Sequence, residues 1–173
     1  MEEQVILVNE SDVPVGVMEK MGAHQKPVLH RAFSVFIFNA AGEMLLQQRA
    51  AHKYHSAGLW TNACCSHPRP GEDTGVAAAR RLKEEMGFST KLEKTFDFIY
   101  QASFGNGLHE FEFDHVFIGR YDNEIVPDPG EVSDYCFMEM GAIQASLKST
   151  PEKYTAWFAI AFPKIVFWKI INT

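Results

Sequence analysis

Residues 66–88 read SHPRPGEDTGVAAARRLKEEMGF and hold the most informative pattern in this chain. An aperiodic segment rich in proline ends in a carboxylate, Glu72, and a helix is predicted over residues 73–86. The apolar stripe of this helix consists of Val76, Ala79, Leu82 and Met86. Gly87 is a typical residue just beyond a helix end. The pattern therefore predicts a loop that leads into a helix packed on a core.

The last turns of this predicted helix carry charged side chains on one face. Arg81, Glu84 and Glu85 stand at positions i, i+3 and i+4, which lie side by side on a helix. Crowded carboxylates repel one another unless a cation lies between them, so a hard divalent metal is one interpretation. A solvated helix face with an Arg81–Glu85 ion pair is the other, because charged helix faces are common.

The segments around this helix are mostly strands. Strands are predicted over residues 4–9, 32–38, 43–49, 92–102, 108–120 and 132–138. Residues 32–38 are apolar at every position except Ser34, which indicates a strand buried on both faces. Residues 50–72 have no period and are predicted to be one long loop, and the C-terminal segment is predicted to be helical with a break or kink at Pro163. The fold class is α/β or α+β, one layered domain over residues 1–173.

Composition excludes several classes of protein. The 173 residues are 46% apolar and carry a net charge of −6, which argues against disorder and against binding to nucleic-acid phosphates. No uninterrupted apolar run is long enough for a membrane span, and no signal peptide is visible at the N-terminus. The cysteines are Cys64, Cys65 and Cys136, an odd number typical of a reducing compartment. We therefore expect a cytoplasmic protein that contacts neither nucleic acid nor membrane.

A second set of residues has metal-ligating side chains. Glu110 and Glu112 are two apart on a predicted strand and point to the same face. Together with His24, His30 and His67 they would suit a five- or six-coordinate Mn, Fe, Mg or Zn ion. The spacing of these segments cannot unite them, and a solvated strand face with isolated histidines is the simpler interpretation of each part.

Cys65 stands two residues before His67 in the segment WTNACCSHP, residues 60–68. A thiol at this place is a candidate nucleophile, acid or base, or metal ligand. The alternative is a buried, inert cysteine. The chain has no Cys-x-x-Cys pair, which weakens a zinc-knuckle or redox interpretation.

Residues 66–88 resemble the Nudix box, Gly-x5-Glu-x7-Arg-Glu-U-x-Glu-Glu-x-Gly-U, in which U is aliphatic. The matching positions are Glu72, Arg80, Leu82, Glu84, Glu85 and Gly87. The chain departs from the box at Ser66, where Gly is usual and a change of backbone is expected, and at Arg81, where Glu is usual. The resemblance implies a Nudix-like layered fold with a mixed β-sheet between helices.

Further motifs make the resemblance more specific. They are Glu19-Lys20-x3-His24, Leu29-His30-x-Ala32-Phe33-Ser34, Trp60-Thr61-Asn62-x2-Cys65-x-His67-Pro68, Glu110-x-Glu112 and Tyr154-Thr155-x-Trp157. In this order and with the altered box, they resemble the type I isopentenyl diphosphate isomerases of the Nudix superfamily, over about residues 4–168. That family tolerates a basic residue at the position of Arg81.

The resemblance implies a role for each matching residue. One divalent metal, Mn²⁺, Zn²⁺ or Mg²⁺, would be bound by His24, His30, His67, Glu110 and Glu112. Glu85 would help to hold Mg²⁺ on the diphosphate of an isoprenoid substrate. Cys65 and Glu112 would be the catalytic groups, Trp157 would face a cationic intermediate, and Tyr100 would hydrogen-bond to Glu112. The diphosphate would be contacted by Lys20, Arg49, Lys53 and Arg81.

Alternatives remain for several of these residues and for the function. A core tyrosine is the equal alternative for Tyr100, a core tryptophan is the alternative for Trp157 without the resemblance, and Cys64 is expected to be a packing residue. A Nudix hydrolase would need no thiol and would prefer Glu at position 81. A non-catalytic metal-binding domain would be indifferent to Cys65. The isomerase is the preferred prediction, as a monomer or weak homodimer.

Overall fold

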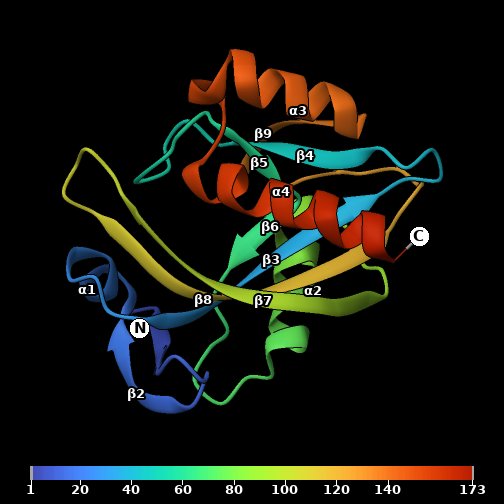
Figure 1. The fold of residues 1–173 in the computed structure, drawn as a ribbon. Helices are drawn as coiled ribbons and strands as arrows, with labels where there is room; N and C mark the ends of the chain where they lie inside the picture. The colour runs from blue at the N-terminus through green and yellow to red at the C-terminus, as the bar shows by residue number, and fades with distance from the viewer. Residues whose placement is uncertain (1, 173) are drawn as a thin grey trace.

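The computed structural model describes residues 2–172 as a mixed β-sheet with helices on both faces (Figure 1). The strands are β1 (Gln4–Val8), β2 (Pro14–Glu19), β3 (His30–Phe38), β4 (Met44–Arg49), β5 (Trp60–Asn62), β6 (Cys64–Ser66), β7 (Leu92–Ser103), β8 (His109–Arg120) and β9 (Val132–Met138). The helices are α1 (Lys20–Gln25), α2 (Thr74–Met86), α3 (Met140–Ser149) and α4 (Ala156–Ile171), with a 3₁₀ turn at Pro151–Lys153. The predicted α/β layered fold, with a mixed sheet between helices, is confirmed.

Strand β3 is the centre of the sheet. It pairs in parallel with β8 over its whole length and antiparallel with β6, while β7 pairs antiparallel with β8. Its side chains alternate between the two cores. Phe33, Val35 and Ile37 pack with α2, whereas Phe36 and Phe38 pack with α4. The prediction of a strand buried on both faces is thus confirmed.

Helix α2 has the predicted extent but not the predicted apolar face. Asp73 caps its start by accepting a hydrogen bond from the Val76 backbone N–H at 3.0 Å, and Gly87 ends it with φ of 78°. Val76 is 61% exposed, so its place in the apolar stripe was wrong. The buried residues of the helix are Ala77, Ala78, Leu82, Glu85 and Met86. The helix therefore turns the carboxylate Glu85 inward.

One other prediction was wrong. The segment 50–72 is not one loop, because it contains β5 and β6, whose three residues each are too short to show a period. The C-terminal segment is helical as predicted, and helix α4 continues through Pro163, so the break, one of the two predicted alternatives there, is absent. Proline removes one helical hydrogen bond, and burial of Trp157, Phe158, Phe162 and Ile165 offsets that cost. Within residues 2–172, the helices are too short or too polar to cross a bilayer.

Candidate active site

The predicted site residues converge on one pocket at an end of the sheet. It is lined by side chains from α1, β4, the loop after β4, β6, α2, β7, β8 and α4. The predicted residues among them are Lys20, Arg49, Lys53, Cys65, His67, Arg81, Glu85, Tyr100, Glu110, Glu112 and Trp157. His24 and His30 lie next to His67, and their ring centroids are 5.7 and 5.0 Å from that of His67. The fold thus brings together the residues to which the resemblance assigned a role.

Strand β8 places the two glutamates. Its alternation directs Glu110 and Glu112 to the same face, where both are buried. The parallel register with β3 sets His30 opposite Glu112, and the antiparallel register with β7 sets Tyr100 opposite Glu112. The Tyr100 hydroxyl oxygen lies 2.6 Å from Glu112 Oε2 and 2.8 Å from Glu110 Oε2, which confirms the predicted contact with Glu112.

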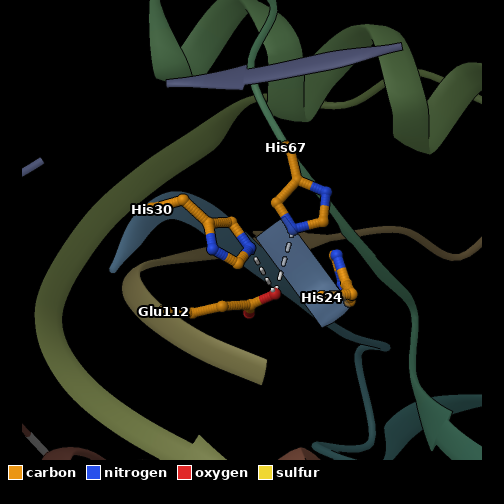
Figure 2. Close-up of side chains that lie close together, drawn as sticks. All are labelled: His24, His30, His67 and Glu112. Carbon is orange, nitrogen blue, oxygen red and sulfur yellow. Dashed lines mark hydrogen bonds and ion pairs between the residues drawn. The ribbon is translucent and has the colours of Figure 1, made fainter. Parts of the chain in front are cut away.

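Four buried residues form a compact group, shown in Figure 2: His24, His30, His67 and Glu112. One ligand atom from each lies within 4.8 Å of the others. Glu112 Oε1 is 2.9 Å from His67 Nε2 and 3.5 Å from His30 Nε2. These residues come from α1, β3, the segment after β6, and β8, so only the folded chain assembles the group.

The hydrogen bonds around the histidines fit a metal ion. His24 Nδ1 is 2.8 Å from the Lys20 carbonyl oxygen, and His30 Nδ1 is 2.8 Å from that of Val28. Each ring therefore donates through Nδ1 and leaves Nε2 as an acceptor. Among the residues described, both Nε2 atoms are buried without a hydrogen-bond partner. Metal-ligating histidines are oriented in this way, so the residues present fit a divalent metal.

Burial and charge set the protonation of this group. Burial lowers the pKa of His67 to about 4 despite its hydrogen bond to Glu112. Burial alone would raise the pKa of Glu112, but the imidazoles of His30 and His67 hold it well below its usual value. Burial and the neighbouring Glu112 raise the pKa of Glu110. A neutral His67 beside an ionised Glu112 is the protonation state that binds metal.

Glu110 belongs to a second, overlapping group. It lies with His24 and His55, and again one ligand atom from each is within 4.8 Å of the others. His55 and its neighbour Tyr54 also line the pocket, although no sequence motif marks them. They lie in the aperiodic segment between β4 and β5, where no spacing marks them as functional.

The two adjacent cysteines have different surroundings. Successive residues of a strand point to opposite faces. Cys64 is fully buried in the core under α2, as expected of a packing residue, whereas Cys65 lines the pocket. The Cys65 thiol donates a hydrogen bond to Asn62 Oδ1 at 3.1 Å and lies 3.4 Å from Ser34 Oγ. Burial and the nearby Asp114 raise its pKa well above the usual value.

The carboxylate of Glu85 lines the same pocket. Glu85 Oε1 accepts a hydrogen bond from Arg81 Nη2 at 2.7 Å, and Oε2 accepts one from Gln47 Nε2 at 2.9 Å. The ion pair of the simpler interpretation is therefore present, but Glu85 is buried rather than solvated. Burial raises the pKa of Glu85 against the effect of Arg81. Glu131, which was not predicted, pairs with Lys53 and with Arg81.

Trp157 lies at the start of α4 and is 3% exposed. The guanidinium carbon of Arg49 is 5.2 Å from the centre of its ring, within the range of a cation–π contact. The indole ring therefore presents an apolar surface to the pocket and already faces a cation.

Comparison with known proteins identifies the family. Residues 28–158 match the model of the NUDIX domain. The chain is 47% identical over 172 residues to isopentenyl-diphosphate Delta-isomerase 2 of Aromatoleum aromaticum, covering 99% of this chain and 91% of that protein. It is 52% identical over 158 residues to isopentenyl-diphosphate Delta-isomerase 2 of Photorhabdus laumondii, covering 91% of this chain and 89% of that protein.

A solved structure supports the fold independently. The DR0079 protein of Deinococcus radiodurans superposes with a TM-score of 0.78 at 20% identity, covering 94% of this chain and 98% of that one. At this identity the likeness concerns the fold alone. The family model and the sequence identities together establish that the chain belongs to the Nudix superfamily and, within it, to the isopentenyl-diphosphate Delta-isomerases.

Proposed function

We propose that this chain interconverts isopentenyl diphosphate and dimethylallyl diphosphate, with Cys65 and Glu112 as the two proton-handling groups. The observation that carries the proposal is their convergence. Cys65 comes from β6 and Glu112 from β8, and both line the same pocket although they are far apart in sequence.

The reaction needs two such groups. Moving the double bond requires one proton delivered to C4 and another removed from C2, through a state that resembles a tertiary carbocation. A positioned acid or base contributes a factor of 10²–10⁴, or about 3–5 kcal/mol, in a typical enzyme. Two such groups account for part of the lowering of the activation barrier, and electrostatic stabilisation and positioning of the substrate must supply the rest.

The metal group supports the role of Glu112. We propose that His24, His30, His67, Glu110 and Glu112 hold one divalent ion. The buried Nε2 atoms of His24 and His30, which have no hydrogen-bond partner among the described residues, support this. When bound, such an ion stabilises the ionised form of a carboxylate ligand and fixes its orientation. The hydroxyl of Tyr100 holds the other oxygen of Glu112 at 2.6 Å, so the carboxylate would face the substrate in one orientation.

The cations at the pocket would bind the diphosphate. Lys20, Arg49, Lys53 and Arg81 line it, although the chain as a whole is acidic. Glu85 lies beside Arg81, and with the substrate it would provide an oxygen ligand for Mg²⁺ on the diphosphate. Two of these cations pair with Glu131 in the free protein, so substrate binding would exchange that carboxylate for phosphate oxygens.

The apolar wall of the pocket would protect the intermediate. A tertiary cation is trapped as an alcohol if water reaches it, so water must be excluded. A cation–π interaction with the buried indole of Trp157 would stabilise the cation by about 0.5–2 kcal/mol. This contribution is too small to drive the reaction, and it would assist the acid and base rather than replace them.

One assay tests the proposal. The protein is incubated with isopentenyl diphosphate and Mg²⁺ in deuterated water, and the products are analysed by mass spectrometry. We expect deuterium in the recovered dimethylallyl diphosphate. Release of inorganic phosphate would instead support a Nudix hydrolase, and unchanged substrate would support a non-catalytic metal-binding domain.

A variant of Glu112 tests whether isomerisation takes place at this site. Glu112→Gln keeps the shape of the side chain and removes its charge and basicity, so we expect isomerisation to fall by at least 100-fold. The same rate in Glu112→Gln as in the unmodified protein would show that Glu112 is not one of the two groups.

A further inference from the structure

The loop between β4 and β5 brings one more imidazole close to His24 and Glu110. His55 is 7% exposed. Its ring stacks on Phe104 at 4.6 Å between centroids and meets Trp157 edge-on at 5.7 Å. Its backbone carbonyl accepts a hydrogen bond from Arg49 Nη2 at 3.2 Å. The ring is therefore fixed from several sides rather than free in a surface loop.

The ring nitrogens of His55 have different neighbours. Nδ1 lies 3.2 Å from the hydroxyl of Ser56. Nε2 faces Glu110 Oε1 at 3.7 Å, which is longer than a hydrogen bond. Such a pair is too far apart to bond directly and close enough to share an ion.

Within each of the two groups, the donor atoms are spaced like ligands of one ion. With metal–ligand bonds of about 2.1 Å, adjacent donors of an octahedron are about 3.0 Å apart and opposite donors about 4.2 Å apart. The measured pairs are 2.9 Å for His67 with Glu112, 3.5 Å for His30 with Glu112, and 3.7 Å for His55 with Glu110. All fall near or within this range.

His24 links the two groups of ligands. It belongs both to the group with His30, His67 and Glu112 and to the group with His55 and Glu110. Its Nδ1 atom lies 2.8 Å from the Lys20 carbonyl, which leaves Nε2 as its one ligand atom. A single ring nitrogen binds one ion, so the two groups cannot each hold an ion through His24 at the same time.

We infer that His55 is a sixth protein ligand of a single ion, which it shares with His24, His30, His67, Glu110 and Glu112. The inference rests on the metal site of the proposed function and extends it. Four imidazoles and two carboxylates would close an octahedral sphere.

Two consequences follow from this ligand set. Magnesium prefers oxygen ligands, whereas imidazole suits transition metals, so the nitrogen-rich set selects against Mg²⁺ at this position. A closed sphere also leaves no open position for substrate. The ion would then act by orienting Glu112, and the diphosphate would depend on the separate Mg²⁺ and the cations of the pocket.

A packing role is the competing explanation for His55, because its ring lies between Phe104 and Trp157. His55→Phe separates the two roles, since it keeps an aromatic ring and removes both nitrogens. His52→Phe is the matched control, because His52 is an exposed histidine of the same loop. His67→Ala removes a ligand of the other group and tests the metal site itself.

The experiment uses Co²⁺ as the probe. Metal-free protein and the three variants are titrated with Co²⁺, and binding is followed by its visible absorption, which is weak for six-coordinate and stronger for five-coordinate Co²⁺. X-ray absorption of the loaded proteins counts the imidazole ligands. Loss of groups that merely orient a ligand typically lowers metal affinity 10–100-fold. We therefore expect His55→Phe to bind Co²⁺ about 100-fold more weakly, with stronger absorption and one imidazole fewer, and His52→Phe to match the unmodified protein.

The outcomes separate the inference from the function on which it rests. An unchanged spectrum and affinity in His55→Phe, together with loss of binding in His67→Ala, would overturn the sixth ligand alone. Unchanged binding in both variants would overturn the proposed metal site as well. Circular dichroism of the metal-free variants checks that each one is folded.

Discussion

Cys64 and Cys65 are chemically identical neighbours that the strand β6 sends to opposite sides. Cys64 has no exposed surface and belongs to the core under α2, whereas Cys65 lines the pocket. We expect Cys65→Ala to lower the isomerisation rate by at least 100-fold, because it removes one of two proton-handling groups. Cys64→Ala should keep the rate and lower the free energy of unfolding by about 1 kcal/mol through the cavity it leaves. Rates come from the deuterium assay, and a fully active Cys65→Ala protein would refute the catalytic assignment.

Tyr100 offers a second test at the scale of one side chain. Its hydroxyl lies between Glu110 and Glu112 and has only one proton to donate. Tyr100→Phe should lower kcat by about 10- to 100-fold with little change in KM, because the hydroxyl orients Glu112 rather than binding the diphosphate. Tyr121→Phe removes a hydroxyl that only donates to the Glu124 carbonyl and is the control. Equal kcat values in the two variants would contradict the role of Tyr100.

Residue patterns selected side chains that converge in the fold where a family motif exists. The histidines, glutamates and thiol stand in motifs that can be matched one by one, and the confirmed family membership explains why they converge. His55 and Glu131 stand in segments without period or motif, so no sequence signal selects them. At Ser66, by contrast, the motif predicted a change of backbone that the structure does not require. Ser66 lies in β6, paired with Phe33 in extended backbone that any residue adopts, so the missing glycine needs no change of backbone there.

At the scale of elements, the length of a pattern decided whether it could be predicted. Strand β9 has the predicted bounds, and β8 begins one residue later than predicted. Both are long enough to show an alternating or apolar pattern. Strands β5 and β6 have three residues each, and α1 has six residues including Gly22, so tertiary contacts rather than local pattern fix them. The short elements carry Cys65 and His24, which is why their placement required the fold.

The end of α2 provides a prediction for an element. Gly87 has φ of 78°, and a Cβ added there would lie 2.0 Å from the Val126 carbonyl oxygen. This close approach lets the loop of residues 121–131 dock on the helix, where the Asp128 N–H donates to the Glu85 carbonyl at 2.9 Å. Gly87→Ala should therefore lower the free energy of unfolding by about 3 kcal/mol or more, because it adds a backbone clash to the strain of positive φ.

Gly42→Ala is the control for this change. Gly42 has φ of 80°, and an added Cβ would meet nothing within 4 Å. Its cost should be that of the backbone conformation alone, about 1 kcal/mol. Urea denaturation measures both variants. Equal losses at the two glycines would show that the contact with Val126 does not hold the loop against the helix.

At the scale of the whole molecule, the fold buries histidines beside carboxylates, and this arrangement makes the free energy of unfolding depend on pH. His67 is the clearest member, because burial lowers its pKa from 6.5 to about 4. In the metal-free protein, the unfolded chain takes up a proton at His67 near pH 6.5, whereas the folded chain does so only near pH 4. Acidification through this window therefore favours the unfolded state, and His67 lowers the free energy of unfolding progressively as pH falls from about 6.5 to about 4.

The size of this effect can be isolated with one variant. Between pH 7 and pH 5, His67 alone should lower the free energy of unfolding by about 2 kcal/mol. His67→Gln cannot titrate, so its stability should fall by about 2 kcal/mol less than that of the unmodified protein over the same interval. Urea denaturation with a chelator at both pH values measures the difference. Parallel losses in the two proteins would mean that His67 titrates normally in the folded chain and is not held neutral for a metal.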